Sequence, residues 1–524
     1  MIDEIKAATK LINEIKFKEI IEKGNKEFTW NKDNFFSIND NGKKKVNITG
    51  VTNEILTNYS IKTIYSSKST TMFIYEDGIF TNKGNAIINN IIENLLKDFA
   101  TFRIVNEIIK KIQRKTMFDF DEFMKIKEDK ICINNCVLDF SNLLKIEMFE
   151  ICSLDPKYVF KSKLNMDYNP KAKCPKLLEF FEKSFYPADI PVIQEWLGYS
   201  LFNRYAFKKA LLIQGITDTG KTVFLNVFKH FLGLKNICSI SLQKLTGLNN
   251  FAISGLYGKS ANVVDELESN DLESTGNFKV ITGGGLVGAE KKFQDAFSFV
   301  NFAKLMFACN KIPSVKNNDI EDDAYYSRWL LISMNNQVSK NEMDEFLINK
   351  LTTIEETSGL LNWALKGLIR LFKNKGFSYH KTAKQNKEIM QRNSNPLMDF
   401  IKLKVIVKNG NCISKNDFYE FYNNFCLEHN YPIFSKNQLS RKLSLYLPNI
   451  RERHDKVRSW INIDVLGLKG NDLNENKIRS CSKCNKEFVK NELKDLLVGD
   501  NTFYFCKDCY DTAKTVVSKR EIIV

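Results

Sequence analysis

The sequence has few histidines and prolines, four and nine among 524 residues, and no long apolar run. No uninterrupted apolar stretch approaches the roughly 18 to 20 residues that a membrane-spanning helix needs. The N-terminal residues lack the layout of a signal peptide and predict an amphipathic helix to about residue 24. Eight of the twelve cysteines are scattered, which is typical of a reducing compartment rather than of a disulfide framework. We therefore expect a cytoplasmic protein without a membrane partner.

The scarcity of histidine bears on one candidate metal site, Asp119-Phe120-Asp121, because carboxylates two residues apart bind the metal ions of polymerases and primases. None of the four histidines, at positions 230, 380, 429 and 454, follows this pair at a useful distance. The flanking residues favour a helix that begins with acidic side chains, which interact favourably with the positive end of the helix dipole. We expect a solvated helix N-terminus here and no primase site.

Acidic residues are fewer than basic ones. The chain carries 77 lysines and arginines against 62 aspartates and glutamates, a formal net charge of +15. A compositional preference for Lys, Asn and Ile accounts for part of this excess, but a folded enzyme this basic usually meets a polyanion. The charge therefore indicates nucleic acid as a partner.

The most informative stretch is a glycine-bearing loop between an apolar run and a helical pattern. The loop reads G-x-x-x-x-G-K-T, and the strand before it and helix after it favour a phosphate-binding loop over a chance glycine-rich turn. Its glycines let backbone N–H groups point inward around an anion at a helix N-terminus. Lys221 is expected to reach the β- and γ-phosphates of ATP, and the Thr222 hydroxyl to ligate Mg²⁺. The predicted loop residues are Gly215, Ile216, Thr217, Asp218, Thr219, Gly220, Lys221 and Thr222.

Three later apolar runs have polar side chains at one end: two runs are followed by them and one run is preceded by an arginine. Asp265 and Glu266 end one of them, and they are predicted to hold Mg²⁺ opposite Thr222 and to polarise the attacking water, respectively. Asn310 ends the next run, where its amide could orient that water. Arg328 precedes the last run and is the candidate for an arginine finger that reaches the γ-phosphate of a neighbouring subunit.

A basic stretch over residues 288–299 predicts a hairpin that bears Lys291, Lys292 and Phe293. Lysines suit contact with a phosphate backbone, and an aromatic ring suits stacking on bases. A surface hairpin with incidental lysines is the alternative, because charge runs are usually solvated faces.

This ordered set resembles the superfamily 3 helicases, and within them the poxvirus-type and phage- or plasmid-type primase-helicase branch. The matching segments are 74–80, 133–139, 168–175, 215–222, 262–266, 279–284 with 290–292, 304–313 and 328–329. Five ordered motifs of the nucleotidase are more specific than one. The chain departs from the family at Gly285, where an acidic residue is common, and at Ser327, where a second arginine is frequent. Arg328 is thus the sole finger candidate.

The resemblance implies an AAA+-like core that assembles as a ring, usually a hexamer, with ATP between subunits. The basic hairpin would then line the central channel and track single-stranded DNA. About 70 residues precede the matching region, too few for the polymerase domain that some members carry, so primase activity is not implied. A primase or polymerase in a separate chain is compatible with this interpretation.

A second nucleic-acid-binding domain is predicted after the boundary at residues 393–396. Three helical patterns, at 397–404, from Ser414 and from Ser435, precede a hairpin whose basic residues come before Trp460. A winged helix has this order and places its third helix and wing on duplex or forked DNA. Family members similarly carry such a domain here; its use for protein contacts alone is the alternative. The candidate DNA contacts are Arg441, Lys442, Arg451 and Arg453.

The last motif is a pair of C-x-x-C units with 21 residues between them. Thiolates at this spacing close a tetrahedral Zn²⁺ site, whereas a redox C-x-x-C normally occurs singly. Four ligands leave no open position, so the site is expected to be structural, a zinc ribbon. The ligands are Cys481, Cys484, Cys506 and Cys509.

The sequence therefore predicts an α/β protein: a P-loop, AAA+-like ATPase core with an N-terminal α+β domain, a C-terminal winged helix and a zinc ribbon. Short strands are expected at 130–139 and 155–167. Two functions stay open: an ATP-dependent helicase that replicates a viral, plasmid or integrated element, and a DNA-binding ATPase that acts as initiator, loader or regulator without unwinding. The expected parts are 1–70 (variable region), 71–185 (pre-helicase domain), 186–345 (ATPase core), 346–392 (helical lid), 393–468 (winged helix) and 476–515 (zinc ribbon).

Overall fold

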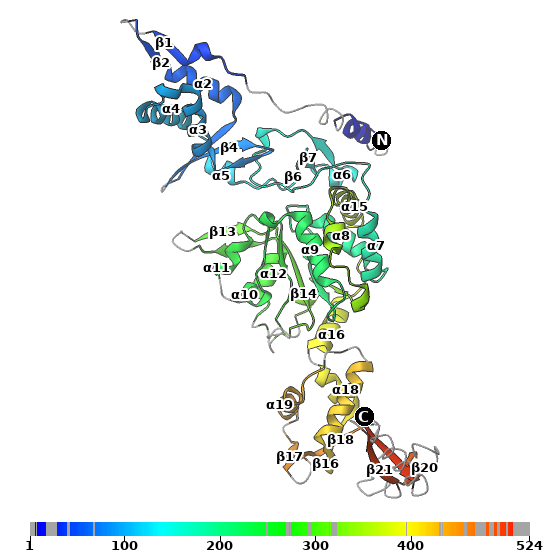
Figure 1. The fold of residues 1–524 in the computed structure, drawn as a ribbon. Helices are drawn as coiled ribbons and strands as arrows, with labels where there is room; N and C mark the ends of the chain where they lie inside the picture. Colours follow the sequence, from blue (N-terminus) through cyan, green and yellow to red (C-terminus); the bar gives the residue numbers. More distant parts are fainter. Residues whose placement is uncertain are drawn as a thin grey trace, which may run out of the picture. The chain divides into compact units, whose positions relative to one another are not determined.

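The computed structural model divides the chain into two compact units, Met1–Pro396 and Leu397–Val524 (Figure 1). Among the described helices, none is both long and apolar enough to cross a membrane. The structure describes residues 6, 8–16, 29–38, 42–66, 69–247, 250–268, 272, 274–291, 296–313, 315, 322–394, 396–428, 431, 433–447, 449–454, 458–466, 478–480, 487–489, 493–498 and 501–506.

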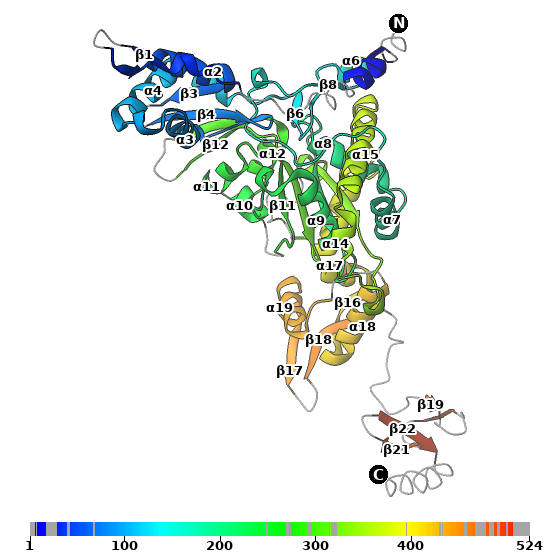
Figure 2. The same ribbon diagram turned by 45° about the horizontal axis from the view of Figure 1, so that its top comes forward.

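The first part of the larger unit is a small α+β module (Figure 2). Its elements are β1 (Phe36–Ile38), β2 (Lys44–Val46), α2 (Ile48–Asn58), β3 (Ile61–Tyr65), β4 (Thr70–Glu76), β5 (Ile79–Thr81), α3 (Gly84–Leu96) and α4 (Phe102–Lys115). Val105, Ile108 and Ile112 recur at helical spacing in α4, and all three are buried with apolar residues of α2, α3 and the antiparallel sheet β3-β4-β5. The module therefore has its own hydrophobic core.

The predicted N-terminal helix is present over residues 8–16, and residues 17–24 lie outside the described residues. Asn13 fixes this helix to a second antiparallel sheet, β6 (Lys130–Cys132), β7 (Val137–Asp139) and β8 (Glu150–Cys152). Its amide donates to the Phe149 carbonyl at 2.8 Å and accepts from the Ile151 N–H at 2.9 Å. The strands expected at 130–139 are confirmed by β6 and β7.

The acidic pair near residue 120 begins a helix, as expected. The Asp119 side chain accepts from the Glu122 N–H at 2.7 Å at the start of α5 (Phe120–Met124). The strand expected over 155–167 is wrong, because that stretch begins with a 3₁₀ turn at Pro156–Tyr158. The Asp155 carboxylate accepts from the Lys157 N–H at 2.8 Å, and such local bonds compete with strand pairing.

The α/β core is confirmed by a five-stranded, fully parallel sheet of order β10-β11-β14-β9-β15. Alternate residues enter opposite cores: Leu211 and Ile213 pack on one side, whereas Ala210 and Leu212 pack on the other. Strands buried on both faces need continuous apolar runs, which these segments have. The strands are β9 (Ala210–Gln214), β10 (Ile237–Cys238), β11 (Ala261–Val264), β14 (Lys304–Cys309) and β15 (Trp329–Ser333).

Helices cover both faces of this sheet (Figure 1). The core on one face includes residues of α7 (Pro175–Ser184), α8 (Ile190–Ser200), α9 (Lys221–Leu232), α14 (Leu347–Leu351) and α15 (Ile354–Lys373). The core on the other includes residues of α10 (Leu242–Thr246), α11 (Asn250–Ile253), α12 (Gly276–Gly283), α13 (Asp323–Tyr326) and α16 (Ala383–Ser394).

Helices α8 and α15 approach each other closely at glycines. A Cβ on Gly367 would lie 2.4 Å from the Gln194 carbonyl oxygen, and one on Gly198 would lie 2.3 Å from that of Ala364. An ion pair joins the same helices, with Nε of the half-buried Arg370 2.7 Å from the Oε1 atom of the fully buried Glu195. The backbones thus meet directly, without a layer of side chains between them.

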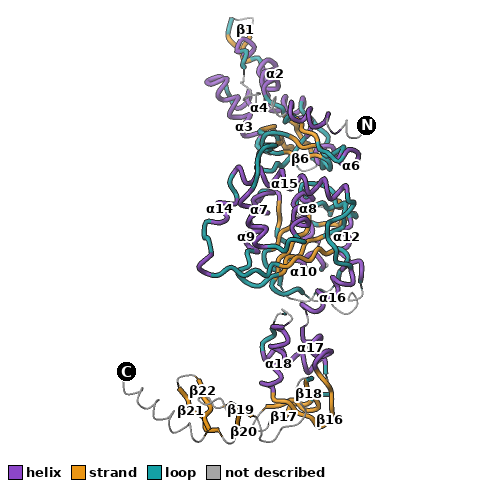
Figure 3. The backbone as a smooth tube through the Cα atoms, turned by 90° about the vertical axis from the view of Figure 1, so that its right-hand side faces the viewer, coloured by secondary structure: helices purple, strands orange, loops and turns teal. Residues whose placement is uncertain are grey.

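The smaller unit has a separate core. Its first part contains α17 (Pro396–Lys404), β16 (Val405–Ser414), α18 (Lys415–Glu428), α19 (Lys436–Tyr446), β17 (Arg451–His454) and β18 (Arg458–Val465). The strands pair antiparallel in the order β16-β18-β17, and α18 packs on β16 and β18 (Figure 3). Ser435 and Gln438 form a reciprocal capping box at the start of α19. Two further hairpins follow, β19 (Ile478–Ser480) with β20 (Glu487–Val489), and β21 (Leu493–Val498) with β22 (Asn501–Cys506).

Replacing Arg370 with Met should destabilise the larger unit strongly, because Glu195 would keep only its two hydrogen bonds from Ser378 at 2.6 and 2.7 Å. Removing one partner of a buried ion pair costs about 3–5 kcal/mol. Urea unfolding of the larger unit measures this loss. The matched control, Lys373→Met on the same helix, removes an exposed lysine and should change the unfolding midpoint little. Equal midpoints for both variants would contradict the stabilising role of the ion pair.

Candidate phosphate-binding site

The glycine-bearing loop connects the end of β9 to the start of α9. A Cβ at Gly215 would meet the Met334 carbonyl oxygen at 2.3 Å and Thr219 Oγ1 at 3.0 Å, so only glycine fits beside the end of β15. Gly220 has φ +84°, a left-handed conformation that favours glycine. Its Cβ would also lie 3.3 Å from the Phe180 ring. Both glycines of the motif are therefore required by the geometry.

Lys221 begins α9 and folds back over the loop. Its Nζ donates to the carbonyl oxygens of Gly215 at 2.7 Å and Ile216 at 2.5 Å. Partial burial lowers the pKa of Lys221, and the charges of Asp218 and Glu266 are among the effects that oppose this shift. The ammonium group is thus held at the mouth of the loop, where an incoming anion could replace the carbonyl oxygens as its partners.

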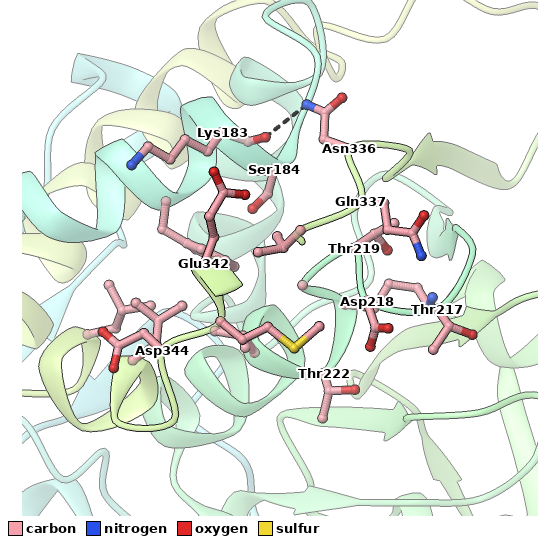
Figure 4. Close-up of a pocket in the computed structure, with 18 of the residues that line it drawn as sticks. Lys183, Ser184, Thr217, Asp218, Thr219, Thr222, Asn336, Gln337, Glu342 and Asp344 are labelled. Carbon is pink, nitrogen blue, oxygen red and sulfur yellow. Dashed lines mark hydrogen bonds between the residues drawn. The ribbon is translucent and has the colours of Figure 1, made fainter. Parts of the chain in front are cut away.

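The loop forms one wall of a cavity of about 1200 Å³ (Figure 4). Of the eight predicted loop residues, Thr217, Asp218, Thr219, Gly220, Lys221 and Thr222 line it, whereas Gly215 and Ile216 do not. Cavities of this size accommodate small-molecule ligands. The combination of loop, helix N-terminus and cavity fits a nucleotide with its phosphates on the loop.

The predicted carboxylates and amide lie on the same cavity. Asp265 and Glu266 follow β11, Asn310 follows β14, and all three line the cavity with the loop. The strand order accounts for this, because β14 lies between β9 and β11. A hydrogen bond of 2.7 Å from the Leu267 N–H to the Ala308 carbonyl fixes the carboxylate turn to β14.

Asp265 has a partner that the sequence analysis did not anticipate. Lys229, eight residues after Lys221 on α9, places its Nζ 2.5 Å from Asp265 Oδ2. Both residues also line a smaller cavity of about 480 Å³ beside the ends of β10 and β11. The sequence held one signal for this pairing. Lys229 follows Lys221 by about two helical turns, which puts both lysines on the side of α9 that faces the site.

Arg328 lies at the N-terminal ends of the parallel strands, whereas the loop lies at their C-terminal ends. Trp329 pairs with Ala210 and Ser333 with Gln214, so the two strands start and end together. Because each residue of a strand advances about 3.3 Å, the five residues of β9 separate Arg328 from the loop by roughly 16 Å. The Arg328 side chain donates instead to Thr282 Oγ1 at 3.0 Å and to the Ala324 carbonyl at 2.5 Å. Arg328 does not line the cavity of its own chain.

The predicted basic hairpin is present as β12 (Leu286–Ala289) paired with β13 (Phe297–Val300). Lys291 Nζ lies 5.4 Å from the centre of the Tyr257 ring and 5.3 Å from that of Phe297, within range of cation–π attraction. Lys292 and Phe293 lie outside the described residues. Three residues connect β13 to the start of β14, so the base of the hairpin lies at the same end of the strands as Arg328.

In the smaller unit, the candidate DNA contacts lie on α19 and β17. Arg441, Arg451 and Arg453 are exposed, and Lys442 is half-buried with its Nζ 5.3 Å from the Phe434 ring centre. Glu452, between the two arginines of β17, pairs with Lys415 at 2.7 Å. Exposed arginines are therefore present on both elements.

The zinc prediction falls largely on residues that the structure does not describe. Cys481, Cys484 and Cys509 lie outside the described residues, and Cys506 is the last residue of β22. Within the described ranges, no group of three or more His, Cys, Asp or Glu side chains could hold a metal ion.

Two walls of the large cavity carried no sequence signal. One is a face of α7, with Lys176, Glu179, Phe180, Lys183 and Ser184. The other is the segment that follows β15, with Asn336, Gln337, Val338 and residues 342–345, continued by Leu347, Lys350 and Leu351. Asn336 donates to the Lys183 carbonyl at 2.8 Å and so ties the two walls together (Figure 4). The Val338 N–H donates to the Asp218 carbonyl at 2.9 Å.

Three family models match separate parts of the chain. A model described as D5 N terminal like matches residues 53–186, and a model described as poxvirus D5 protein-like matches residues 392–475. DUF5906, a family of unknown function, matches residues 213–328, which contain the loop, the carboxylates, Asn310 and Arg328. The two D5 models therefore match segments on either side of the DUF5906 match.

Solved structures of the NrS-1 C-terminal region are similar to the chain. The A form apo structure shows 14% identity, covers 79% of this chain and 98% of its own, and has a TM-score of 0.42. A second apo structure shows 13% identity, covers 79% of this chain and 98% of its own, and has a TM-score of 0.40. Among curated proteins, the sequence comparison gives no match.

Gly215→Ala should abolish nucleotide binding, because the added Cβ cannot fit 2.3 Å from the Met334 carbonyl and the loop must move. Titration with a fluorescent ATP analogue measures the affinity. Gly288→Ala is the matched control, since no atom lies within 4 Å of the added Cβ in the hairpin. The control should bind as the wild type does; unchanged binding by Gly215→Ala would contradict the loop geometry.

Proposed function

We propose that the protein is an ATP-dependent DNA helicase of the superfamily 3 type that serves replication. The observation that carries the proposal is the gathering of the phosphate loop, Asp265, Glu266 and Asn310 on one cavity at the C-terminal ends of parallel strands. The D5-like family matches support a replication-related function and, with it, the use of nucleotide and Mg²⁺.

Each group on the cavity has a role in hydrolysis that its chemistry suits. Lys221 would exchange its two carbonyl partners for the β- and γ-phosphates. Thr222 and Asp265 would hold Mg²⁺, which supplies charge neutralisation on the phosphates. Glu266 would accept a proton from the attacking water, and Asn310 would orient that water. Lys229 would have to release Asp265, or share it, when the metal binds.

Arg328 supports a ring in which ATP lies between subunits. It is roughly 16 Å from the phosphate loop of its own chain, because β9 is five residues long, and a single side chain does not reach that far. At the end of the strands opposite the loop, Arg328 is suited to complete the site of a neighbouring copy. A homo-hexamer is the assembly that the helicase resemblance implies.

DNA contacts are proposed on two surfaces. The hairpin β12–β13, with Lys291, Lys292 and Phe293, would follow a single strand through the ring. The order of helices and antiparallel strands in residues 397–465 supports a winged helix, which would put Arg441 and Lys442 of α19 and Arg451 and Arg453 of β17 on duplex or forked DNA. A zinc ribbon formed by Cys481, Cys484, Cys506 and Cys509 is part of the proposal.

The direct test is strand displacement from labelled forks of both polarities. Wild-type protein with ATP should separate one type of fork, and Lys221→Ala should separate neither, because no other side chain of the loop supplies its charge. DNA-stimulated ATP hydrolysis without displacement of either fork would instead support a loader or regulator. No hydrolysis at all by the wild type would overturn both.

Mixing two inactive variants tests the position of Arg328. Arg328→Ala rings and Lys221→Ala rings should each be inactive, because arginine fingers are worth about 10³ to 10⁵ in rate. Mixed rings should recover hydrolysis wherever an intact Lys221 faces an intact Arg328 of the neighbouring subunit. ATP hydrolysis after co-assembly, verified by sizing, is the measurement. Co-assembly without recovered hydrolysis would contradict action between subunits.

A further inference from the structure

The small N-terminal module carries an unusual concentration of positive charge. Residues 43–58 and 97–116, which contain α2 and α4, have nine lysines and arginines against three carboxylates. Two of those carboxylates are engaged within the module. Glu107 pairs with Arg103 at 3.0 Å, and Glu54 accepts from the Asn31 N–H at 3.2 Å and the Asn34 amide at 2.7 Å. Most of the positive charge is therefore not neutralised locally.

Helix α4 concentrates this charge on its outer side. Val105, Ile108 and Ile112 are buried, so the polar side chains of the same helix point away from the module core. Lys110 and Arg114, four residues apart, are exposed one turn after another. Lys111 and Lys115 lie nearer to α2, also one turn apart. We call these four residues, together with Thr49 and Asn53 of α2, the α2–α4 face.

The partners of the two inner lysines are neutral. Lys111 Nζ donates to Thr49 Oγ1, and Lys115 Nζ donates to Asn53 Oδ1 at 2.7 Å. These two bonds repeat at a spacing of four residues on both helices, so they form two rungs one helical turn apart. In the described part of the chain, neither Lys110, Lys111, Arg114 nor Lys115 forms an ion pair with a carboxylate.

Lysines elsewhere in the larger unit are of two kinds, and some of them, such as Lys161 and Lys259, donate to main-chain carbonyl oxygens. Lys157, Lys183, Lys279, Lys350 and Lys373 each pair with an aspartate or glutamate. The α2–α4 face is distinguished by clustering, because four cations without carboxylate partners lie within six residues of one helix.

We propose that the α2–α4 face binds the phosphate backbone of DNA without reading its sequence, as a contact separate from the hairpin and the smaller unit. Two rows of cations, each with members one turn apart, present charge to successive phosphates, and release of the phosphates' counterions supplies the affinity. Thr49 and Asn53 add neutral hydrogen-bonding groups beside the inner row, as backbone contacts commonly use.

An anionic membrane surface would offer the same charge, but the face lacks the apolar side chains that insert into a bilayer. The one highly exposed apolar residue of α4 is Phe102, 87% exposed. It precedes Lys111 by nine residues, or two and a half helical turns, so it points away from the inner row, whereas Lys110 lies eight residues on and nearer to its side of the helix. A single aromatic ring is far less apolar surface than the face of a membrane-binding helix. The face thus fits a polar polyanion.

The test is the salt dependence of DNA binding by the full chain without nucleotide. Fluorescence anisotropy with single-stranded and duplex oligonucleotides of equal length gives the affinity at several salt concentrations. In Lys111→Gln/Lys115→Gln the slope of log K against log salt should fall by about 1.4 for the single strand and about 1.8 for the duplex. The loss of affinity from 50 to 200 mM salt should accordingly be about sevenfold smaller than in the wild type for the single strand.

Two further variants make the result specific. Lys157→Gln/Lys373→Gln removes the same charge from lysines that have carboxylate partners, and it should leave the slope unchanged. Lys110→Gln/Arg114→Gln alters two exposed side chains, and it should lower the slope as the inner pair does, even if the inner variant folds poorly. Circular dichroism and thermal unfolding that match those of the wild type verify the fold of both variants.

The outcomes separate this proposal from the proposed function. If the wild type binds DNA but neither face variant changes the slope, or if the paired-lysine control changes it equally, the α2–α4 face is overturned and the helicase proposal stands. If the wild type binds no DNA, both fall. A reduced slope with one form of DNA only identifies the form that the face contacts and supports the proposal.

Discussion

The common direction of five strands is the constraint on which the candidate site depends. Because β9, β11 and β14 all run the same way, the loop, the two carboxylates and Asn310 come together at the C-terminal ends of the strands without any of them being close in sequence. The same constraint puts Arg328 at the N-terminal ends, since β15 is parallel to β9 and in register with it. The C-terminal ends of the strands thus carry a nearly complete site, and the N-terminal ends carry an arginine suited to complete the same site in another copy.

The sequence predicted those parts of the site whose chemistry is local. Gly215, Gly220 and Lys221 belong to one short segment, and strands buried on both faces leave continuous apolar runs that end at Asp265 and Asn310. The two other cavity walls could not be predicted in this way. Asn336 and Lys183, which join them, are 153 residues apart, and a contact between distant segments has no periodicity in either one.

The strand prediction over residues 155–167 was wrong because strand pairing also depends on distant segments. Residues 155–167 have the apolar content of a strand, but the Asp155 side chain and Pro156 favour a tight turn, and only an isolated bridge from Leu164 to Ile133 pairs with a neighbour. In contrast, α5 and α19 begin where the sequence predicted, because Asp119 and Ser435 satisfy the first N–H groups of their own helices. Capping is decided within four residues, whereas strand pairing is decided by the partner.

The glycine contacts between α8 and α15 fix two helices that support the sheet without lining the cavity. Gly198 and Gly367 bring two backbones together with no adjustable side chains between them, and the Glu195–Arg370 ion pair fixes their register. Helices packed in this way neither slide nor separate by small steps, because tight packing transmits strain instead of absorbing it. The cavity wall after β15, residues 334–346, is irregular apart from one short turn. A change of conformation in that segment would alter the cavity without disturbing the packing of α8 on α15.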